Sequence, residues 1–180
     1  AVLSAEDKHF FQHAGFDPMG ILRAVLVDIR DRRGTQGAST LTQQLARTLW
    51  LGPERGWRRK VPETLITMHL EQQLTKEQIF EDYANAIYLG HQGSFSIHGF
   101  AQAASVYLGK DLSQVTAADA ALIAGLIQSP IGRNPFRYPD RARGRRNVIL
   151  KAMRENGYLT EEQFQDAAAS PLNEIGRAHV

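Results

Sequence analysis

Residues 76–88 read K-E-Q-I-F-E-D-Y-A-N-A-I-Y, and their apolar side chains repeat with the period of an α-helix. The repeat falls at Ile79, Phe80, Tyr83, Ala84, Ile87 and Tyr88. Positions three and four residues apart lie on one face of a helix, so these side chains form a stripe with polar residues opposite. Thr75 and Gln78 form a capping-box pattern at its start. The segment predicts an amphipathic helix over 76–88.

The same periodicity dominates the rest of the chain. It predicts further helices at 39–51, 62–74, 117–127, 142–155 and 160–169. The almost entirely apolar segment 117–127 is typical of a helix buried on most sides, and Asn156-Gly157 is a C-cap signal. No convincing alternating stretch indicates a sizeable sheet, so we expect an all-α fold. Loops rich in Gly, Pro, Arg or Ser are expected at 32–37, 52–57, 90–96 and 130–139.

Length and composition are those of a globular domain. The chain has 180 residues, of which 43% are apolar and 22% charged, enough for one domain with a core, with or without a small lobe. No run of eighteen apolar residues indicates a membrane span. The absence of cysteine excludes disulfides and thiolate chemistry and leaves the redox compartment open.

The net charge is only +2, but the basic residues are clustered. The clusters are Arg30, Arg32 and Arg33; Arg55, Arg58, Arg59 and Lys60; and Arg133, Arg137, Arg141, Arg143, Arg145 and Arg146. The planar fork of arginine suits phosphate recognition. Solvated helix faces are an equally good interpretation of any single cluster.

Polar residues are concentrated in three blocks. They read E-D-K-H-F-F-Q-H-A-G at 6–15, G-A-S-T-L-T-Q-Q at 37–44 and R-K-V-P-E at 59–63. Because each buried polar group needs a partner, blocks this dense are a poor way to build a core. We interpret them as the lining of a site for sugar and phosphate chemistry.

Five motifs carry a family resemblance. They are E-D-x-x-F-x-x-H-x-G at 6–15, G-A-S-T-L-T-Q-Q at 37–44, R-K-x-x-E at 59–63, K-x-x-I-x-E-x-Y-x-N at 76–85 and R-R-N-V-I-L at 145–150. In this order they resemble the peptidoglycan glycosyltransferase family (glycosyltransferase family 51), the glycan-polymerase domain of class A penicillin-binding proteins. One motif alone is a weak signal, whereas five in order are specific.

The resemblance implies a lysozyme-like helical lobe and a small membrane-facing jaw lobe at about 16–36, within a domain of residues 1–174. Apolar residues in the jaw segment stand beside the first arginine cluster, which suits insertion near anionic headgroups as well as it suits core packing. Residues 175–180 read I-G-R-A-H-V and match a reading frame of a common sequencing adapter, so we expect a non-native tail there. We also expect the domain to be truncated just ahead of Glu6.

The implied reaction is inverting glycosyl transfer between lipid-linked sugars. The growing glycan on a polyprenyl diphosphate is the donor, and lipid II attacks through its 4-hydroxyl. An attacking alcohol needs a carboxylate base within hydrogen-bond reach, tuned by partial burial, and the resemblance assigns this role to Glu6. Taken without the resemblance, Glu6 is better explained as a carboxylate at a helix start, favoured by the helix dipole. Asp7 and His13 are expected to be supporting residues.

The leaving group decides between a transferase and a hydrolase. A glycosidase must protonate a departing alkoxide, whereas a diphosphate leaves as a stable anion and mainly needs positive charge. Arg59, Lys60 and Arg47 supply that charge. Glu63 resembles the second essential glutamate of the family, and we expect it to orient these cations or to help hold a divalent cation, Mg²⁺ or Mn²⁺, at the diphosphate.

The remaining candidate site residues are predicted to bind substrate. Ser39, Thr40, Gln43 and Gln44 offer donors and acceptors for phosphate and sugar oxygens, although Ser39 and Thr40 also fit a helix cap. We interpret Lys76, Glu81, Tyr83 and Asn85 as mainly structural, with substrate contact expected at Lys76 and Asn85. Two roles are open for Arg145 and Arg146, which are binding of phosphate and anchoring of a C-terminal helix. We prefer the anchoring interpretation.

Two positions depart from the commonest family pattern. Family members often carry Lys-Asn where this chain has Arg47 and Thr48, which changes the geometry of the donor grip. Pro62 lies inside the third motif and is tolerated if a helix begins there.

The resemblance predicts lipid II, the lipid-linked glycan and the membrane surface as partners, at the extracytoplasmic face of a bacterial cytoplasmic membrane. A fused transpeptidase domain and cell-wall synthesis proteins are further expected partners, and nucleic acid is not. The alternative enzyme is a muralytic, lysozyme-like hydrolase or lytic enzyme. A helical module that binds nucleic acid through its arginines is the third interpretation, and it leaves Glu6 and Glu63 without a role.

Overall fold

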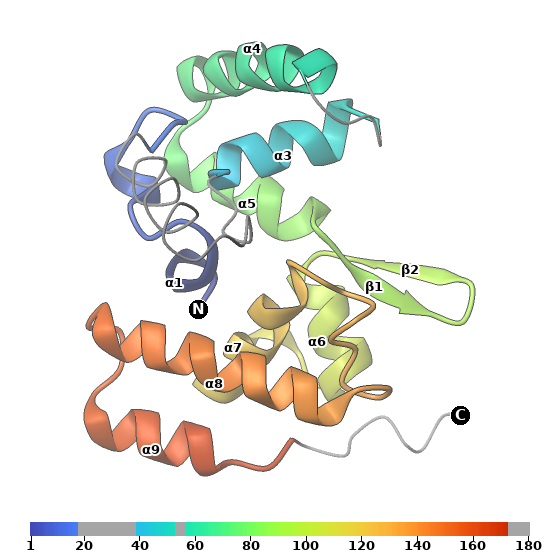
Figure 1. Cartoon of the computed structure of the whole chain (residues 1–180), viewed down its shortest axis with the longest axis vertical. Helices are drawn as coiled ribbons and strands as arrows, with labels where there is room; N and C mark the ends of the chain where they lie inside the picture. The colour runs from blue at the N-terminus through green and yellow to red at the C-terminus, as the bar shows by residue number, and fades with distance from the viewer. Residues whose placement is uncertain (18–38, 53–56, 173–180) are drawn as a thin grey trace. The chain divides into compact units, whose positions relative to one another are not determined.

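The structure, a computed structural model, describes residues 1–17, 39–52 and 57–172. The chain forms two compact units, which are drawn in Figure 1. Unit 1 comprises Ala1–Lys8 and Ala84–Val180, and unit 2 comprises His9–Tyr83. The predicted tail at 175–180 and nearly all of the predicted jaw lobe at 16–36 lie outside the described residues.

Unit 1 is built around the apolar helix α7 (Ala117–Leu126), in which eight of ten residues are buried. The helices α1 (Val2–Glu6) and α8 (Pro139–Glu155) both pack on α7, and α9 (Glu161–Ala169) runs beside α8 (Figure 1). Their shared core consists of Ala118, Ala121, Ala124, Ile149, Leu150, Met153 and Ala167. Small residues on α7 allow the neighbouring helices to lie close to its backbone. Because α7 is covered on most sides, it needs almost no polar face.

A short hairpin and α6 (Phe100–Leu108) complete unit 1. The strands β1 (Tyr88–Gln92) and β2 (Phe95–His98) pair antiparallel, with a register shift between Tyr88 and Gly90. A Cβ on Gly90 would lie 2.4 Å from the Tyr107 hydroxyl, which donates to the carbonyl of Leu89 at 2.9 Å. Burial, and then the nearby Tyr88, raise the pKa of Tyr107 to about 12. Glycine at position 90 is therefore needed for this close contact.

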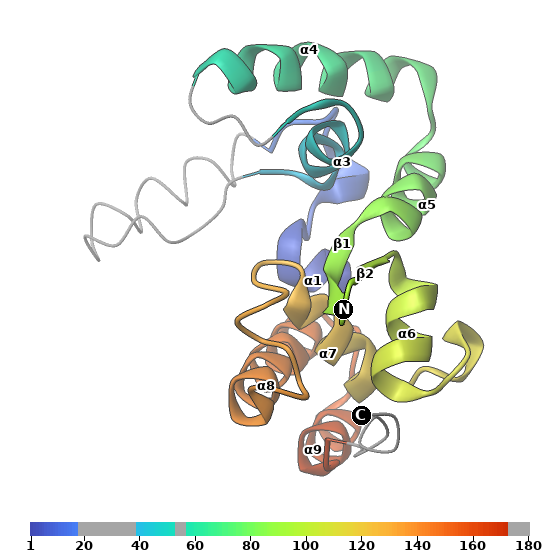
Figure 2. The same ribbon diagram turned by 90° about the vertical axis from the view of Figure 1, so that its right-hand side faces the viewer.

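Unit 2 consists mainly of three helices. They are α3 (Leu41–Trp50), α4 (Trp57–Gln73) and the part of α5 (Lys76–Ala86) up to Tyr83. In Figure 2, α4 crosses over α3, which is seen nearly end-on. Short 3-10 helices occur at Phe10–Gln12 in this unit and at Leu112–Gln114 in unit 1. The predicted buried stripe of α5 is confirmed at Ile79 and Tyr83.

The helical fold predicted from the sequence is confirmed, with corrections at element ends. The predicted helix 76–88 ends at Ala86, because Tyr88 opens β1 and the expected loop 90–96 lies in the hairpin. The helix predicted at 142–155 begins earlier, with Pro139 in its first turn, where proline needs no N–H partner. The expectation that a helix begins at Pro62 is wrong, because α4 begins at Trp57 and Pro62 lies inside it. The capping box of Thr75 and Gln78 is confirmed.

Arg146 fastens the end of α9 to α8. Only 1% of this residue is exposed, and its guanidinium donates to the carbonyls of Ala168 at 2.9 Å and Ser170 at 2.7 Å. A cation at the C-terminus of a helix also favours the helix dipole. The anchoring interpretation of Arg146 is therefore confirmed. No helix among the described residues has the length and apolar character needed to cross a membrane.

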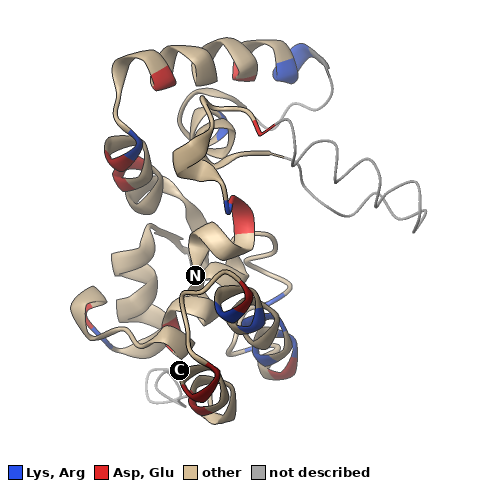
Figure 3. Cartoon of the chain, turned by 90° about the vertical axis from the view of Figure 1, so that its left-hand side faces the viewer, with Lys and Arg blue, Asp and Glu red and all other residues tan. Residues whose placement is uncertain are grey.

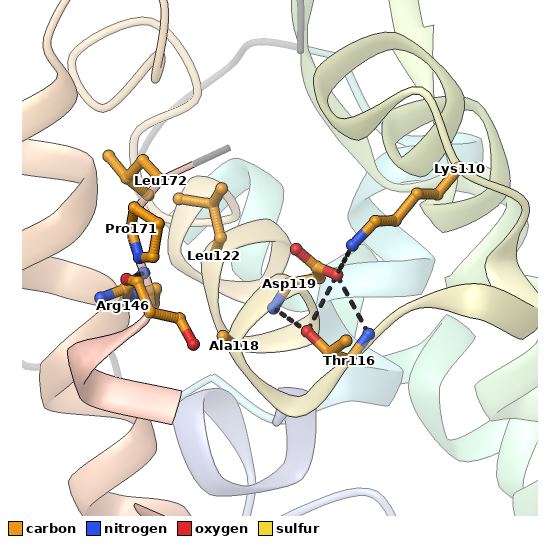
Figure 4. A pocket seen from close by; sticks show the side chains of 9 residues that line it. Lys110, Thr116, Ala118, Asp119, Leu122, Arg146, Pro171 and Leu172 are labelled. Atoms are coloured by element: carbon orange, nitrogen blue, oxygen red, sulfur yellow. Dashed lines mark hydrogen bonds and ion pairs between the residues drawn. The ribbon is translucent and has the colours of Figure 1, made fainter. Parts of the chain in front are cut away.

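A cavity of about 170 Å³ lies in unit 1 beside Asp119 and Arg146 (Figure 4). Asp119 accepts hydrogen bonds from Lys110 and from the backbone and hydroxyl of Thr116, which caps α7. Burial raises the pKa of Asp119, but these hydrogen bonds outweigh it and the net pKa lies below its usual value. The Asp119 carboxylate in the cavity wall is thus held in place by Lys110 and Thr116.

We expect replacement of Arg146 by methionine to destabilise unit 1 by about 3 kcal/mol, because a buried charged donor and its hydrogen bonds to two half-buried residues are lost. Replacement by lysine should cost less, since one donor can still reach one carbonyl. Urea unfolding followed by circular dichroism measures both free energies. Equal stabilities of wild type and Arg146→Met would contradict the anchoring role.

We expect Asp119→Asn to lower the free energy of unfolding by about 1–2 kcal/mol at neutral pH. Since the folded pKa of Asp119 is depressed, its contribution is present above the unfolded value of about 4 and is lost as pH falls through the folded pKa. The difference between wild type and variant should therefore shrink below about pH 4. Asp140→Asn, at an exposed pair with Arg143, is the control and should change stability little.

Candidate active site

The predicted site residues are distributed over both units. Unit 1 contains Glu6 and Asn85, and unit 2 contains all the others. Unit 2 holds Glu63 with its basic neighbours, the block at 39–44, Arg47 and Lys76.

Glu63 is a buried carboxylate between two cations. It is 1% exposed, Lys60 Nζ donates to its Oε1 at 2.5 Å, and Arg59 Nε lies 3.7 Å from its Oε2. All three residues lie on α4, where a spacing of three and four residues places them on one face. The side chains of Lys60 and Arg59 are 41% and 27% exposed, so the positive charge reaches the surface while the carboxylate does not. This is the geometry expected if Glu63 orients the two cations.

Thr40 begins α3 and ties the second motif to the first. Its hydroxyl accepts from Gln43 N–H at 3.3 Å, and the Gln43 side chain accepts from Thr40 N–H at 3.2 Å. The same hydroxyl donates to the carbonyl of Gly15 at 2.6 Å. Gly15 has a φ of +83°, and a Cβ there would lie 2.8 Å from Thr67 Cγ2. Glycine at position 15 therefore allows the first motif to approach α3 and α4.

Most of the hydroxyl-amide block is buried, contrary to the expectation that so polar a block avoids the core. Thr40, Gln43 and Gln44 are at most 5% exposed, and Ser39 is half-buried. Gln44 Oε1 accepts from the Tyr83 hydroxyl at 3.0 Å. The block is tolerated inside unit 2 because its polar atoms find protein partners. Contact of these four residues with substrate stays a prediction.

Lys76 is held by the protein in the same unit. Its Nζ donates to Glu71 Oε1 at 2.7 Å and lies 4.5 Å from the centroid of the Phe10 ring. Thr42 donates to the same oxygen of Glu71. Sequence reasoning did not single out Glu71, because its partners come from other helices. These contacts agree with a mainly structural role for Lys76.

Arg47 and Asn85 are less strongly held. Arg47 is half-buried in the last turn of α3, and Asn85 is exposed near the end of α5. The backbone of Asn85 meets Gly99, where a Cβ would lie 2.7 Å from the Asn85 carbonyl oxygen. Substrate binding by the side chains of Arg47 and Asn85 stays a prediction.

Glu6 lies half-buried at the end of α1, in an arginine-rich part of unit 1. Burial and the charge of Arg133 lower the pKa of Arg145, and the nearby charge of Glu6 acts in the opposite direction. Arg133 Nη1 donates to the carbonyl of Gly125 at 3.2 Å, and a Cβ on Gly125 would lie 3.1 Å from Arg145 Cγ. The clusters in the sequence included both arginines, but no spacing indicated that Arg145 would lie near Glu6.

Groups of three or more His, Cys, Asp or Glu side chains that could hold a metal ion do not occur among the described residues. The only candidate metal ligand predicted from the sequence, Glu63, is already next to Lys60 and Arg59. Two positive groups beside a single carboxylate do not form a resident site for a divalent cation.

Comparisons with known proteins agree with the motifs. The sequence profile of the transglycosylase family matches residues 1–154. Penicillin-binding protein 1A of Escherichia coli is 44% identical over 173 residues, covering 96% of this chain and 20% of that protein. A Cupriavidus necator protein named as a transglycosylase is 42% identical over 172 residues, covering 96% of this chain and 72% of that protein.

A solved structure shows the same relationship. The crystal structure of penicillin-binding protein 1A from Haemophilus influenzae matches with a TM-score of 0.50 and 28% identity, over 73% of this chain and 16% of that chain. The chain thus spans about a fifth of the length of the penicillin-binding proteins that it matches. On the extent of the profile match and the shared identity, the chain belongs to the transglycosylase family, the family of peptidoglycan glycosyltransferases that its five motifs resemble.

Proposed function

We propose that this chain polymerises lipid II into β-1,4-linked glycan strands with inversion and releases polyprenyl diphosphate. The family assignment supports the reaction class. The observation that carries the proposal is the buried Glu63 with Lys60 and Arg59, because it presents positive charge to a departing anion and offers no general acid. No comparison favours the muralytic alternative.

In this proposal Glu6 acts on the nucleophile. Its carboxylate accepts the proton of the acceptor 4-hydroxyl as that oxygen attacks the anomeric carbon of the donor. Arg145 is a positioning residue, because its guanidinium lies near Glu6 and can orient the carboxylate toward the 4-hydroxyl. The new bond forms on the face opposite the departing diphosphate, which accounts for inversion.

The basic residues of α4 act on the leaving group. As the anomeric C–O bond breaks, negative charge grows on the diphosphate, and Lys60 and Arg59 stabilise it. Glu63 holds both cations in place through its buried carboxylate. Arg47, Ser39, Thr40, Gln43, Gln44, Lys76 and Asn85 are proposed to bind the remaining substrate groups.

The divalent cation is proposed to belong to the substrate-bound state. Mg²⁺ commonly takes one or two carboxylates together with substrate phosphate oxygens. The residues around Glu63 do not supply a complete set of ligands, so the diphosphate would contribute most of them. When bound, the cation would add positive charge at the departing diphosphate beside that of Lys60 and Arg59.

The whole protein is proposed to work at the extracytoplasmic face of a bacterial cytoplasmic membrane, where lipid II is presented. The matches to much longer penicillin-binding proteins support a larger parent with a fused transpeptidase domain. Binding to the membrane surface and to cell-wall synthesis proteins is part of the same proposal.

We expect Glu6→Gln to reduce polymerisation of lipid II about 10²–10⁴-fold, because the amide cannot accept the proton. Gel analysis of labelled glycan and release of polyprenyl diphosphate measure the reaction, and circular dichroism checks the fold. Glu162→Gln, an exposed change on α9, is the control and should retain activity. Substantial polymerisation by Glu6→Gln would reject the base assignment, whereas shortening of intact sacculi by wild type would support a hydrolase.

We expect a chelator to reduce polymerisation without changing the stability of the substrate-free chain, because the cation binds together with the diphosphate. Thermal unfolding with and without Mg²⁺ should give the same midpoint, and added diphosphate should make the midpoint depend on Mg²⁺. A clear Mg²⁺-dependent shift without diphosphate would instead show a resident metal site.

A further inference from the structure

Unit 1 carries a row of arginines that the proposed chemistry does not fully use. Arg133, Arg137, Arg141 and Arg145 follow one another at four-residue intervals, from the turns before α8 into the helix itself. We call these four residues the arginine ridge. Blue positions are prominent along α8 in Figure 3, whereas red ones mark α9.

The first and last arginines of the ridge meet on α7, and Arg145 there lies near Glu6. Arg133 and Arg145 both meet Gly125 on α7, one through a hydrogen bond to its carbonyl and the other through packing on its Cα. Their charges are close enough to repel each other, and Glu6 is close enough to attract Arg145. Arg145 therefore links the ridge to the proposed base.

The rest of the ridge is exposed. Arg141 lies one helical turn before Arg145, and its Cζ is 4.8 Å from the centroid of the Tyr138 ring. The backbone N–H of Arg137 donates to Asn134 Oδ1 at 3.2 Å, and the Asn134 residue itself is buried. The turn that presents Arg137 is therefore held from inside the unit.

Most other arginines of α8 have protein partners, which sets the ridge apart. Arg143 pairs with Asp140 at 2.8 Å, and Arg154 pairs with Glu161 at 2.9 Å. Within the described part of the chain, Arg137 and Arg141 have no carboxylate within ion-pair distance. An exposed guanidinium without a carboxylate partner keeps its paired N–H donors available, and carboxylates match that fork.

Aromatic surface accompanies these charges. Phe136 and Tyr138 are 42% and 40% exposed. Rings beside unpaired guanidinium groups suit a ligand with both flat apolar surface and negative groups, which a sugar ring substituted with a short acidic peptide provides.

We propose that the arginine ridge binds the peptide carboxylates of the glycan strand on which Glu6 acts. This inference rests on the proposed function, because it takes the glycan as the substrate. The ridge favours such a strand over a membrane surface, because Arg145 lies near Glu6 and the exposed aromatic side chains beside the ridge are few. The ridge would guide the strand and retain it between additions.

The test measures binding of soluble, uncross-linked glycan fragments whose peptides carry free carboxylates. We expect the double variant Arg137→Gln/Arg141→Gln to bind them about tenfold more weakly than wild type at low salt. Arg143→Gln, an exposed arginine of the same helix with a partner in the protein, should bind as wild type does. Fragments with amidated peptides should bind all three proteins weakly and about equally.

Several results would overturn the proposal. One is equal binding of the free-acid fragments by wild type and the double variant, with both folded by circular dichroism. Another is an equal loss with amidated fragments, and a third is a loss confined to phosphatidylglycerol vesicles, which would make the ridge a membrane surface. Absence of lipid II polymerisation by wild type, together with the expected fragment binding, would reject the proposed function and leave the ridge in place.

Discussion

The packing of α1 and α8 on the apolar helix α7 is the contact on which unit 1 depends. Because α7 is buried along most of its length, its neighbours are held by shape as well as by apolar area. This packing affects the site at Gly125, because a methyl group at that position would press on the Arg145 side chain. Helix α7 therefore contacts both α1, which carries Glu6, and Arg145, which lies near Glu6.

Unit 2 follows a different principle, in which buried polar atoms satisfy one another. Gly15, Thr40 and Gln43 form a hydrogen-bonded group at the start of α3, and Tyr83 holds Gln44 from α5. Such a network is stable only when it is complete, because an unpartnered buried group costs about 1–3 kcal/mol. The density of polar residues in the second motif is therefore a structural requirement as well as a candidate binding surface.

Helix periodicity and capping patterns predicted most of the fold, whereas contacts over long sequence separations were not predictable. The helix ends at Thr75, Thr160 and Asn156-Gly157 were visible because caps are local. The hairpin was missed because its strands are only five and four residues long and a register shift interrupts their alternation. The start of α4 was wrongly predicted at Pro62, because the first turns of this helix carry no strong start signal in the sequence.

The two glutamates illustrate the same division within the candidate site. The partners of Glu63 lie three and four residues away on its own helix, within the motif from which the resemblance already predicted that Glu63 orients them. The surroundings of Glu6 come from the turn before α8 and from α8 itself, which only the packing on α7 brings near. The carboxylate of Glu63 is taken up by the two cations of its own helix, which it holds in place. The half-buried Glu6 faces no such pair on its own helix, and its properties depend on tertiary packing. The position and surroundings of the proposed base therefore depend on α7 and α8, whereas the local pairing at Glu63 depends mainly on α4.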